Sequence, residues 1–362
     1  MNAYAAKPLP LLSSDIDSSI YGEALIDAFA QLEVYKAKLD GSKLNQMWFL
    51  PTLQKKEALA SSQLEGTQAT LDGVLENQVV PNENDKNLSE VQNYLIAAES
   101  GYFFLQKEKV NMAFFKHIHE ILMGGKTRKS KATIPGEFRT EQNYIGKLNT
   151  RNSISFIPPV AESVLPLMEN LVEYMVSPND NLRHLVRIAI IHAQFETIHP
   201  FMDGNGRVGR ILIPLYLYSQ DQIPLPCFFI SEALERDKFK YYALLNETRK
   251  NNWNDWLVFF LQTVTSQSKK YICIIDKINE LYERDMRRAS SVIRSKVTVD
   301  IINLLYEYPV ITTKILMEKL RIPGASAARY LTSLANAKIL FVDGKSRNRS
   351  YYYYELINLV RG

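Results

Sequence analysis

The sequence contains only two cysteines, Cys227 and Cys273, among its 362 residues. A single pair cannot build the disulfide framework of a small secreted domain, and a zinc ribbon requires a second pair of cysteines. The cysteine content therefore excludes a disulfide-stapled scaffold and a cysteine-based zinc module.

Long hydrophobic runs are also missing. Charged residues interrupt every apolar stretch before it reaches the roughly 18 residues that a transmembrane helix needs. The first residues, MNAYAAKPLPLLSSDID, lack the cationic start and the apolar core of a signal peptide. We therefore expect a cytoplasmic protein with no membrane partner.

The composition predicts a folded chain with a substantial core. Hydrophobic residues make up 46% of the sequence, and the length is typical of two or three domains. The net charge is only +4, but residues 295–362 contain ten Lys and Arg against five Asp and Glu. The basic excess is thus concentrated at the end of the chain.

Helical periodicity dominates the sequence, because apolar residues recur every three to four positions in a series of long segments. These segments cover residues 20–39, 53–64, 88–106, 112–123, 161–175, 182–198, 208–219, 238–248 and 254–285. Strand-like material is confined to a candidate hairpin at 142–157 and to the tail at 339–354. The charged stretch 284–296 is either a linker or the end of a helix. The expected fold class is mainly α.

The most distinctive stretch is HPFMDGNGRVGR, residues 199–210. The segment before it has an apolar helical face, which Pro200 should end just after His199. The segment after it, RVGRILIPLYLYSQ, is again typical of a helix. The stretch is therefore predicted to be a loop between two helices that runs into the first turn of the second.

Such a loop is suited to hold phosphate groups. Gly204 and Gly206 allow the backbone to approach an anion closely and to point consecutive N–H groups at it. The N-terminus of the second helix adds a partial positive charge. Arg207 and Arg210 are three residues apart, so both can lie on one side of that helix and bind phosphate.

Two further residues of this stretch supply the remaining chemistry. Asp203 is a hard oxygen ligand that suits Mg²⁺ bridging phosphates. His199, whose unperturbed pKa would be about 6.5, can take a proton from a hydroxyl near neutral pH. The combination indicates phosphoryl or nucleotidyl transfer.

Other interpretations of the glycines and histidines fail on context. Gly204, Gly206 and Gly209 match the GxGxxG pattern of dinucleotide-binding folds, but a helix precedes them where a strand is required. Residues 124–127 resemble the end of a phosphate-binding P-loop, yet Glu120 stands where its first glycine belongs. The histidines at positions 117, 119, 184 and 192 are interpreted as packed or solvated side chains rather than metal ligands.

The same stretch resembles the signature of the Fic family, HxFx(D/E)GNGRxxR. Every specified position is present, namely His199, Phe201, Asp203, Gly204, Asn205, Gly206, Arg207 and Arg210. The resemblance spans about residues 110–265 and implies a Fic-type helical core with a small β-hairpin flap. It also implies a protein adenylyltransferase, which moves AMP from ATP to a Tyr, Thr or Ser hydroxyl of a target protein.

The resemblance implies a role for each residue of the loop. His199 would be the general base, Asp203 would bind Mg²⁺, and Phe201 would anchor the loop in the core. The residues expected to hold the nucleotide are Gly204, Asn205, Gly206, Arg207 and Arg210, with Arg210 on the γ-phosphate. Relatives that phosphorylate their targets carry Lys in place of the second glycine, so Gly206 argues against that activity.

The flap of the family corresponds here to the predicted hairpin at 142–157. In the family this hairpin aligns the target segment by main-chain pairing, so that the hydroxyl reaches the base. The residues expected to dock the target are Gln142, Asn143, Tyr144 and Ile145. The alternative is an ordinary surface hairpin.

A second family motif lies upstream, in SSQLEG at residues 61–66. Ser61, Glu65 and Gly66 fit the inhibitory pattern (S/T)xxxE(G/N) of the family. Ser61 and Glu65 share a helix face, and Gly66 is expected to end the helix. A Glu in the last turn lies at the unfavourable end of the helix dipole, and the resemblance makes Arg210 its cationic partner. We therefore expect the enzyme to be inhibited intramolecularly by this motif.

The last part of the chain has a different pattern. Three predicted helices, with the tight turn RIPGA between the second and third, precede a hairpin with Asp-Gly at its turn, which resembles a winged helix-turn-helix. The recognition helix is expected at residues 326–337 with Arg329 exposed, and the wing would carry Lys345, Arg347 and Arg349. The basic charge favours DNA. However, the helix offers few base-reading side chains, and such domains also serve protein interaction or dimerisation.

These features predict an N-terminal helical region with the inhibitory helix (1–108), a Fic catalytic core (109–284) and a winged helix-turn-helix domain (285–362). The expected activity is autoinhibited transfer of AMP from ATP, with Mg²⁺, to a target protein and to the chain itself. Two alternatives stay open: a DNA-binding regulator whose Fic site senses nucleotide, and an enzyme that mainly removes AMP, with Glu65 positioning water. Whether the chain forms a homodimer is also left open.

Overall fold

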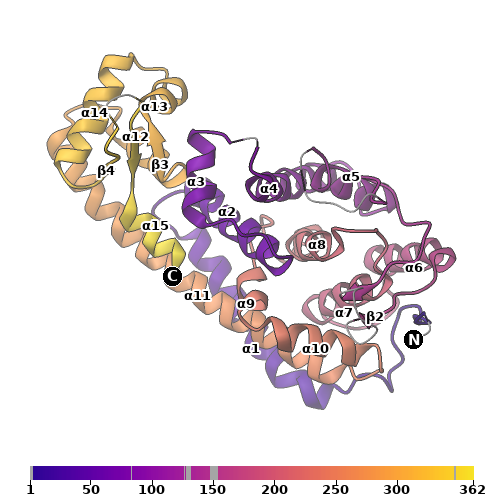
Figure 1. The fold of residues 1–362 in the computed structure, drawn as a ribbon. Coiled ribbons are helices and arrows are strands. Elements are labelled where there is room, and N and C mark those ends of the chain that lie inside the picture. Colours follow the sequence, from indigo (N-terminus) through magenta and orange to yellow (C-terminus); the bar gives the residue numbers. More distant parts are fainter. Residues whose placement is uncertain (1–2, 83, 126, 128–131, 147–153, 346–347) are drawn as a thin grey trace.

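The computed structural model describes residues 3–82, 84–125, 127, 132–146, 154–345 and 348–362. Within them the chain is mainly helical, with two small antiparallel sheets (Figure 1), so the predicted fold class is confirmed. The helices that precede the C-terminal part are α1 (Ser18–Asp40), α2 (Gln46–Leu64), α3 (Leu71–Val79), α4 (Lys86–Leu105), α5 (Met112–Leu122), α6 (Val164–Val176, after a 3-10 turn at Ala161–Ser163), α7 (His184–Ile198), α8 (Asn205–Ser219), α9 (Ser231–Arg236), α10 (Lys238–Thr248) and α11 (Asn254–Val292). None of the helices in the described ranges is both long and apolar enough to cross a lipid bilayer.

α7 and α8 form the centre of the helical part that precedes α12. Every residue of α7 from Leu185 to Ile198 is buried. A helix that is buried on all sides must be surrounded by other helices, and α7 contacts α6, α8, α10 and α11. α8 in turn contacts α2, α4 and α5. The loop between α7 and α8 is therefore held on a closely packed scaffold.

α1 and α11 lie side by side along one edge of the molecule (Figure 1). The Tyr35 hydroxyl of α1 donates to the buried carbonyl oxygen of Cys227 at 2.8 Å, and Lys38 pairs with Asp276 of α11 at 2.6 Å. α11 is 39 residues long and continues to Val292. The charged stretch at 284–296 is thus largely the end of a helix, and the boundary predicted after residue 284 falls inside α11.

The predicted hairpin is present as β1 (Ile145–Gly146) and β2 (Ile154–Phe156), which pair antiparallel. The residues that connect the two strands lie outside the described part of the chain.

The C-terminal part contains α12 (Thr298–Glu307), β3 (Val310–Thr312), α13 (Thr313–Leu320), α14 (Gly324–Asn336), β4 (Phe341–Val342), β5 (Ser350–Tyr352) and α15 (Tyr354–Arg361). Its strands form one antiparallel sheet in the order β3-β5-β4. This arrangement is consistent with the predicted winged helix. β3 and α15 were not expected from the sequence, because a three-residue strand gives almost no periodic signal and α15 follows a run of four tyrosines, which favours a strand.

The first half of α2 is anchored to this C-terminal part by side-chain hydrogen bonds. The Thr52 hydroxyl donates to the Tyr306 carbonyl oxygen at 2.7 Å, and Lys55 Nζ donates to that of Glu307 at 3.2 Å. Lys56 Nζ donates to the carbonyl oxygens of Val360 and Arg361 at 2.6 and 3.1 Å. These lysines donate hydrogen bonds to carbonyl oxygens at the ends of α12 and α15, where the last carbonyl groups of a helix have no partner within the helix.

Candidate active site

The loop from His199 to Gly204 begins with a sharp change of backbone direction. His199 is the C-cap of α7 and has a left-handed conformation, with φ of 50°. Its N–H still donates to the carbonyl oxygen of Phe195 at 2.9 Å. The helix therefore ends where the sequence predicted, and the conformation turns the chain away from the axis of α7 directly at the histidine.

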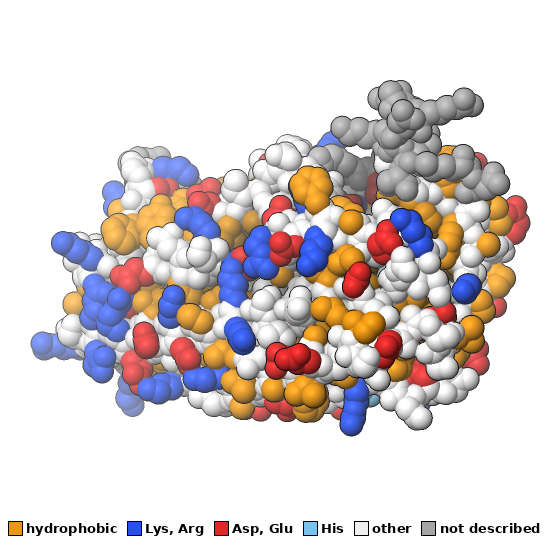
Figure 2. All heavy atoms as spheres, turned by 90° about the horizontal axis from the view of Figure 1, so that it is seen from below, with side chains coloured by type: hydrophobic (Ala, Val, Ile, Leu, Met, Phe, Trp, Pro, Cys, Tyr) orange, Lys and Arg blue, Asp and Glu red, His pale blue; other side chains and the backbone are white. Residues whose placement is uncertain are grey.

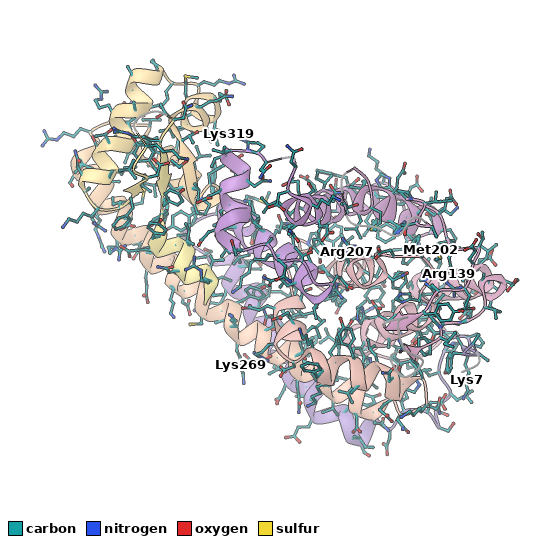
Figure 3. All side chains as sticks on the ribbon, viewed as in Figure 1. Lys7, Arg139, Met202, Arg207, Lys269 and Lys319 are labelled. Atoms are coloured by element: carbon teal, nitrogen blue, oxygen red, sulfur yellow. The ribbon has the colours of Figure 1, made fainter. Side chains whose placement is uncertain are left out.

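Arg139, which the sequence did not single out, and Asn143, which was predicted to dock the target but is only 6% exposed, hold this loop in place. Arg139 Nε donates to the His199 carbonyl oxygen at 2.9 Å, and the Arg139 N–H donates to that of Pro200 at the same distance. Asn143 Nδ2 donates to the Phe201 carbonyl oxygen at 2.8 Å. Figure 3 labels Arg139 and Met202 close together at this loop. The segment before β1 thus fixes the backbone on both sides of the histidine.

Phe201 anchors the loop in the core, as the resemblance implies. It is fully buried and stacks on His119 of α5, with ring centroids 3.7 Å apart. The Gly136 N–H donates to His119 Nδ1 at 3.0 Å, so His119 Nε2 carries the proton that it donates to the Asp203 carbonyl oxygen, also at 3.0 Å. His119 is therefore a packing and hydrogen-bonding residue of the loop.

The start of α8 has the geometry of an anion-binding site. Gly204 is its N-cap in a left-handed conformation, with φ of 81°, and Asn205 closes the turn by hydrogen bonds in both directions with the backbone of Phe201. A Cβ on Gly204 would lie only 2.7 Å from Met123 Sδ. The first N–H groups of α8, which no helical carbonyl can satisfy, are therefore presented at the loop.

Arg207 lies at this same helix end and is almost fully buried (Figure 3). Its Nη2 contacts Met123 Sδ at 3.5 Å, whereas Nε and Nη1 have no hydrogen-bond partner. Buried guanidinium nitrogens without a partner are costly unless a ligand supplies one. The Asp203 carboxylate lies 3.8 Å from Arg207 and is 39% exposed.

His199 is held in its neutral form. Burial and the nearby Arg249 guanidinium lower the pKa of the imidazole to about 3. Its Nδ1 lies 3.4 Å from the carbonyl oxygen of Glu196, an arrangement that favours a proton on Nδ1 and a free lone pair on Nε2. A neutral imidazole of this kind can accept a proton.

Arg210 is held by the residues of the predicted inhibitory motif. Its Nε donates to the Ser61 hydroxyl at 2.8 Å, and its Nη2 donates to the Ser61 carbonyl oxygen at 2.8 Å and to Glu65 Oε1 at 2.7 Å. Burial alone would raise the pKa of the Glu65 carboxyl, but the Arg210 guanidinium outweighs it, and that pKa lies below its usual value. The predicted contact between these residues is therefore present in the structure.

The end of α2 brings the Glu65 carboxyl over the start of α8. Glu65 is the C-cap, and Gly66 follows with φ of 93°. The N–H groups of Gly66 and Thr67 donate to the carbonyl oxygens of Gln63 and Ser62, which is a Schellman cap. A Cβ on Gly206 would lie 2.2 Å from Glu65 Oε1, so the carboxyl rests directly on that glycine.

Comparison with known families agrees with this geometry. A model of the Fic/DOC family matches residues 109–217, and a model of the Fic/DOC family N-terminal region matches residues 23–103. The chain belongs to the Fic/DOC family.

Known members of the Fic/DOC family match parts of the chain. The probable protein adenylyltransferase of Aquifex aeolicus (strain VF5) is 27% identical over 209 residues, which are 56% of this chain and 57% of that protein. Protein adenylyltransferase fic-1 of Caenorhabditis briggsae is 35% identical over 141 residues, 38% of this chain and 24% of that protein. The matches thus span little more than half of the first relative and about a quarter of the second.

The fold of the whole chain is also known in this family. A crystal structure of a Fic family protein from Desulfovibrio desulfuricans G20 covers 96% of this chain and 98% of its own, with a TM-score of 0.60 and 17% identity. The N-terminal helices, the central part and the C-terminal part therefore occur together in another Fic/DOC protein.

A buried network behind the predicted inhibitory motif was missed by the sequence analysis. Glu57 of α2 accepts hydrogen bonds from the Ser231 N–H at 3.0 Å, from the Ser231 hydroxyl, and from the Tyr94 hydroxyl at 3.1 Å. Glu57, Ser61 and Glu65 are each four residues apart, so this network holds the helix face that carries the motif. The spacing is visible in the sequence, but its partners on α4 and α9 are not.

The remaining predicted site residues lie elsewhere on the molecule. Gln142 Nε2 donates to the Pro158 carbonyl oxygen at 3.0 Å beside the hairpin, and Tyr144 is 42% exposed. In the C-terminal part, Arg329, Lys345 and Arg349 are exposed, and Arg347 lies outside the described residues. Figure 2 shows Lys and Arg side chains gathered at the end of the molecule that carries this part.

Proposed function

We propose that this chain is a protein adenylyltransferase that moves AMP from ATP to a hydroxyl of a target protein, and to itself. The printed names of its relatives support this activity. The observation that carries the proposal is the pairing of a neutral His199 with the helix N-terminus of α8, where buried Arg207 has two nitrogens without a partner.

The proposed reaction needs one proton acceptor and a rigid phosphate site. The target hydroxyl loses its proton to His199 Nε2 as its oxygen forms a bond to the α-phosphorus of ATP. The bond from that phosphorus to the bridging oxygen breaks, and pyrophosphate leaves. The α8 amides and Arg207 hold the phosphates in place, and the flap presents the target.

The residues at the loop also fit Mg²⁺. Mg²⁺ in nucleotide sites is held by one or two carboxylates together with phosphates and water, and Asp203 offers one partly exposed carboxylate beside Arg207. No cluster of three or more metal-ligating side chains occurs in the part of the chain that the structure describes. The ion would neutralise phosphate charge when bound.

We further propose that Glu65 inhibits the enzyme. Its carboxylate forms an ion pair with the guanidinium of Arg210, the residue that the family resemblance assigns to the γ-phosphate. A γ-phosphate carries the same sign of charge, so it competes with Glu65 for Arg210. The resting enzyme would then bind ATP in a misaligned, slow form.

The proposal is tested with ATP labelled on the α-phosphate and the full-length chain. We expect Glu65→Gly to label itself faster than the wild type, because Arg210 becomes free. Adding His199→Ala to that variant should remove the labelling, since the loss of a general base costs about 10²–10⁴-fold. Glu247→Gly is the matched control, because Glu247 is also near a helix end and its ion pair with Lys250 lies on the surface.

The outcomes separate the alternatives. A folded Glu65→Gly chain that binds ATP and labels itself no faster than the wild type contradicts the inhibitory role. Loss of AMP removal from a labelled target in that variant would instead identify the enzyme that removes AMP. Labelling that survives His199→Ala would remove the proposed base.

DNA is a second proposed partner, on the evidence of the exposed cations of the C-terminal part. Arg329 and the wing residues Lys345, Arg347 and Arg349 could neutralise about four phosphates, which predicts a log–log salt slope of binding of about −3.6. Binding of the full-length chain to a duplex at low salt, and its loss when these residues are replaced by Ala, would support DNA. No binding at low salt would leave protein interaction as the role of this part.

A further inference from the structure

Glu196 is a buried carboxyl group next to the proposed base. It lies in the last turn of α7 and is only 6% exposed. Its Oε2 is 4.0 Å from His199 Nδ1, and its Oε1 has no hydrogen-bond partner. The side chain is therefore an ionisable group with one carboxyl oxygen that lacks a hydrogen-bond partner, next to the proposed base.

A purely structural role does not account for this arrangement. An unpaired buried carboxyl costs free energy that an apolar or amide side chain would avoid. The neighbouring helix even makes room for it, because a Cβ on Gly209 of α8 would lie 2.6 Å from Glu196 Oε1. Gly209, which is not one of the specified positions of the Fic signature, thus leaves space for the carboxyl.

Charged and titratable groups face Glu196 from several elements. Burial raises its pKa to about 7, while Arg210 lowers the pKa, Glu65 raises it and Arg249 lowers it. The groups around it are His192 on α7, His199 at the C-cap of α7, Arg210 on α8, Tyr241 and Tyr242 on α10, Arg249 at the end of α10, and Glu65 at the end of α2. Arg249 donates to the backbone carbonyl oxygen of Glu196 at 3.3 Å, whereas the Glu196 carboxyl lies beside His199.

We propose that Glu196 is a positioning residue for His199, whose carboxylate stabilises the imidazolium formed during AMP transfer. The inference rests on the proposed function. Before the reaction, Nδ1 carries the proton and Nε2 is free. When Nε2 accepts the proton of the target hydroxyl, a positive charge appears on a ring that burial and Arg249 both disfavour. The Glu196 carboxylate, 4.0 Å away, offsets that charge and keeps its own proton state during the step.

The test uses the full-length chain with Glu65→Gly, so that self-labelling is readily measured. Glu196→Gln keeps the shape of the side chain and removes its charge. We expect the rate at about pH 8 to fall on the order of tenfold to a hundredfold. The rise in rate with pH, which follows ionisation of Glu196 at or below about pH 7, should disappear, because no carboxylate can form.

A second measurement does not depend on activity. In ¹³C-histidine-labelled protein, the His199 signal is identified by its absence in His199→Ala. We expect this signal to shift with pH as Glu196 ionises, and Glu196→Gln should abolish the shift. Gln194→Ala is the matched control, because Gln194 is a buried polar residue of the same helix whose amide donates to the Lys7 carbonyl oxygen and which carries no charge.

The possible results are distinguishable. An unchanged rate and pH profile in Glu196→Gln, with His199→Ala inactive, overturns the inference and leaves the proposed function intact. An equal loss of rate at every pH, without any change of the His199 signal, also overturns it, because that is a structural effect. Absence of labelling in Glu65→Gly itself contradicts the proposed function instead.

Discussion

Arg210 makes buried contacts that a bound nucleotide would have to replace. Its side chain is 1% exposed, and its three hydrogen bonds to Ser61 and Glu65 all reach one helix from a distant part of the chain. Such charge-assisted contacts are stronger than neutral ones. A nucleotide can use this guanidinium only by replacing contacts that the protein already makes.

Ser61→Ala should relieve the proposed inhibition by Glu65 only in part. The variant loses the bond from Arg210 Nε to the Ser61 hydroxyl but keeps the bonds to the Ser61 carbonyl oxygen and to Glu65. One such contact is worth about 1.5 kcal/mol, or roughly tenfold in an equilibrium. We expect a rate of self-labelling between the rate of the wild type and the rate of Glu65→Gly. Ser62→Ala, whose buried hydroxyl has no partner, is the control and should behave like the wild type.

Glu196→Gln should stabilise the protein, and more so at high pH. The pKa of Glu196 is raised from its ordinary 4.5 to about 7 in the folded chain, so folding is penalised as pH rises through that window. The gain should be close to zero below about pH 4 and approach about 3 kcal/mol above about pH 7. Urea unfolding at acid and alkaline pH measures it. A gain that does not change with pH would contradict the raised pKa.

Among single residues, the sequence predicted those of the loop better than those that hold the loop in place. The eight signature residues, Ser61, Glu65 and Gly66 lie in two short stretches whose spacing can be recognised directly. Arg139, His119 and Glu57 act through partners that are distant in sequence, so neither a loop residue nor a helical residue of this kind gives a local signal of its contacts. Asn143 was predicted for the target-docking flap, whereas its side chain donates to the backbone of the loop. Glu196 was missed because it looks like one more polar residue of a helical segment.

At the scale of elements, α2 connects two tasks. Its first half is anchored to the C-terminal part through Thr52, Lys55 and Lys56, and its last turn carries Ser61 and Glu65. Burial lowers the pKa of Lys55 to about 8, so this anchor would weaken as its charge is lost in alkaline solution. The helix end itself is fixed by the Schellman cap at Gly66.

Gly66→Ala should disturb the position of Glu65 without a steric clash. Nothing lies within 4 Å of a Cβ at this position, so the cost comes only from the left-handed backbone, with φ of 93°. That cost is about 1 kcal/mol. We expect a slightly lower melting temperature and self-labelling above that of the wild type. Gly22→Ala, in the second turn of α1 with equally open space, is the control and should be neutral or stabilising.

The elements that the sequence failed to predict share a physical cause. α3, α9 and α15 have nine, six and eight residues, at most about two and a half turns, so an apolar face repeats too few times to stand out. Their stability comes from packing against longer helices. The long helices were predicted because their apolar faces repeat over several turns. The end of α11 was misplaced since its last turns are strongly charged and exposed on one side.

At the scale of the whole molecule, the C-terminal part and the loop are linked through α2. We expect Lys56→Met to raise self-labelling of the otherwise wild-type chain, because it removes two bonds that hold α2 to Val360 and Arg361. In the Glu65→Gly background the same change should have no further effect, since the proposed inhibitory carboxylate is already absent. Lys38→Met, which breaks a surface pair between α1 and α11, is the control. Equal increases in both backgrounds would contradict the link.

The anchoring of α2 to the last residues also has a consequence for the order of synthesis. α2 leaves the ribosome early, and the complete loop with Arg210 follows, but Val360 and Arg361 come about 150 residues later. At about 5–20 residues per second, roughly 8–30 s pass between these events. During that interval a nascent chain has the loop from His199 to Gly204, while the first half of α2 lacks its partners at the C-terminal end. Chains that stop short of these residues are therefore expected to be the least restrained form of the protein.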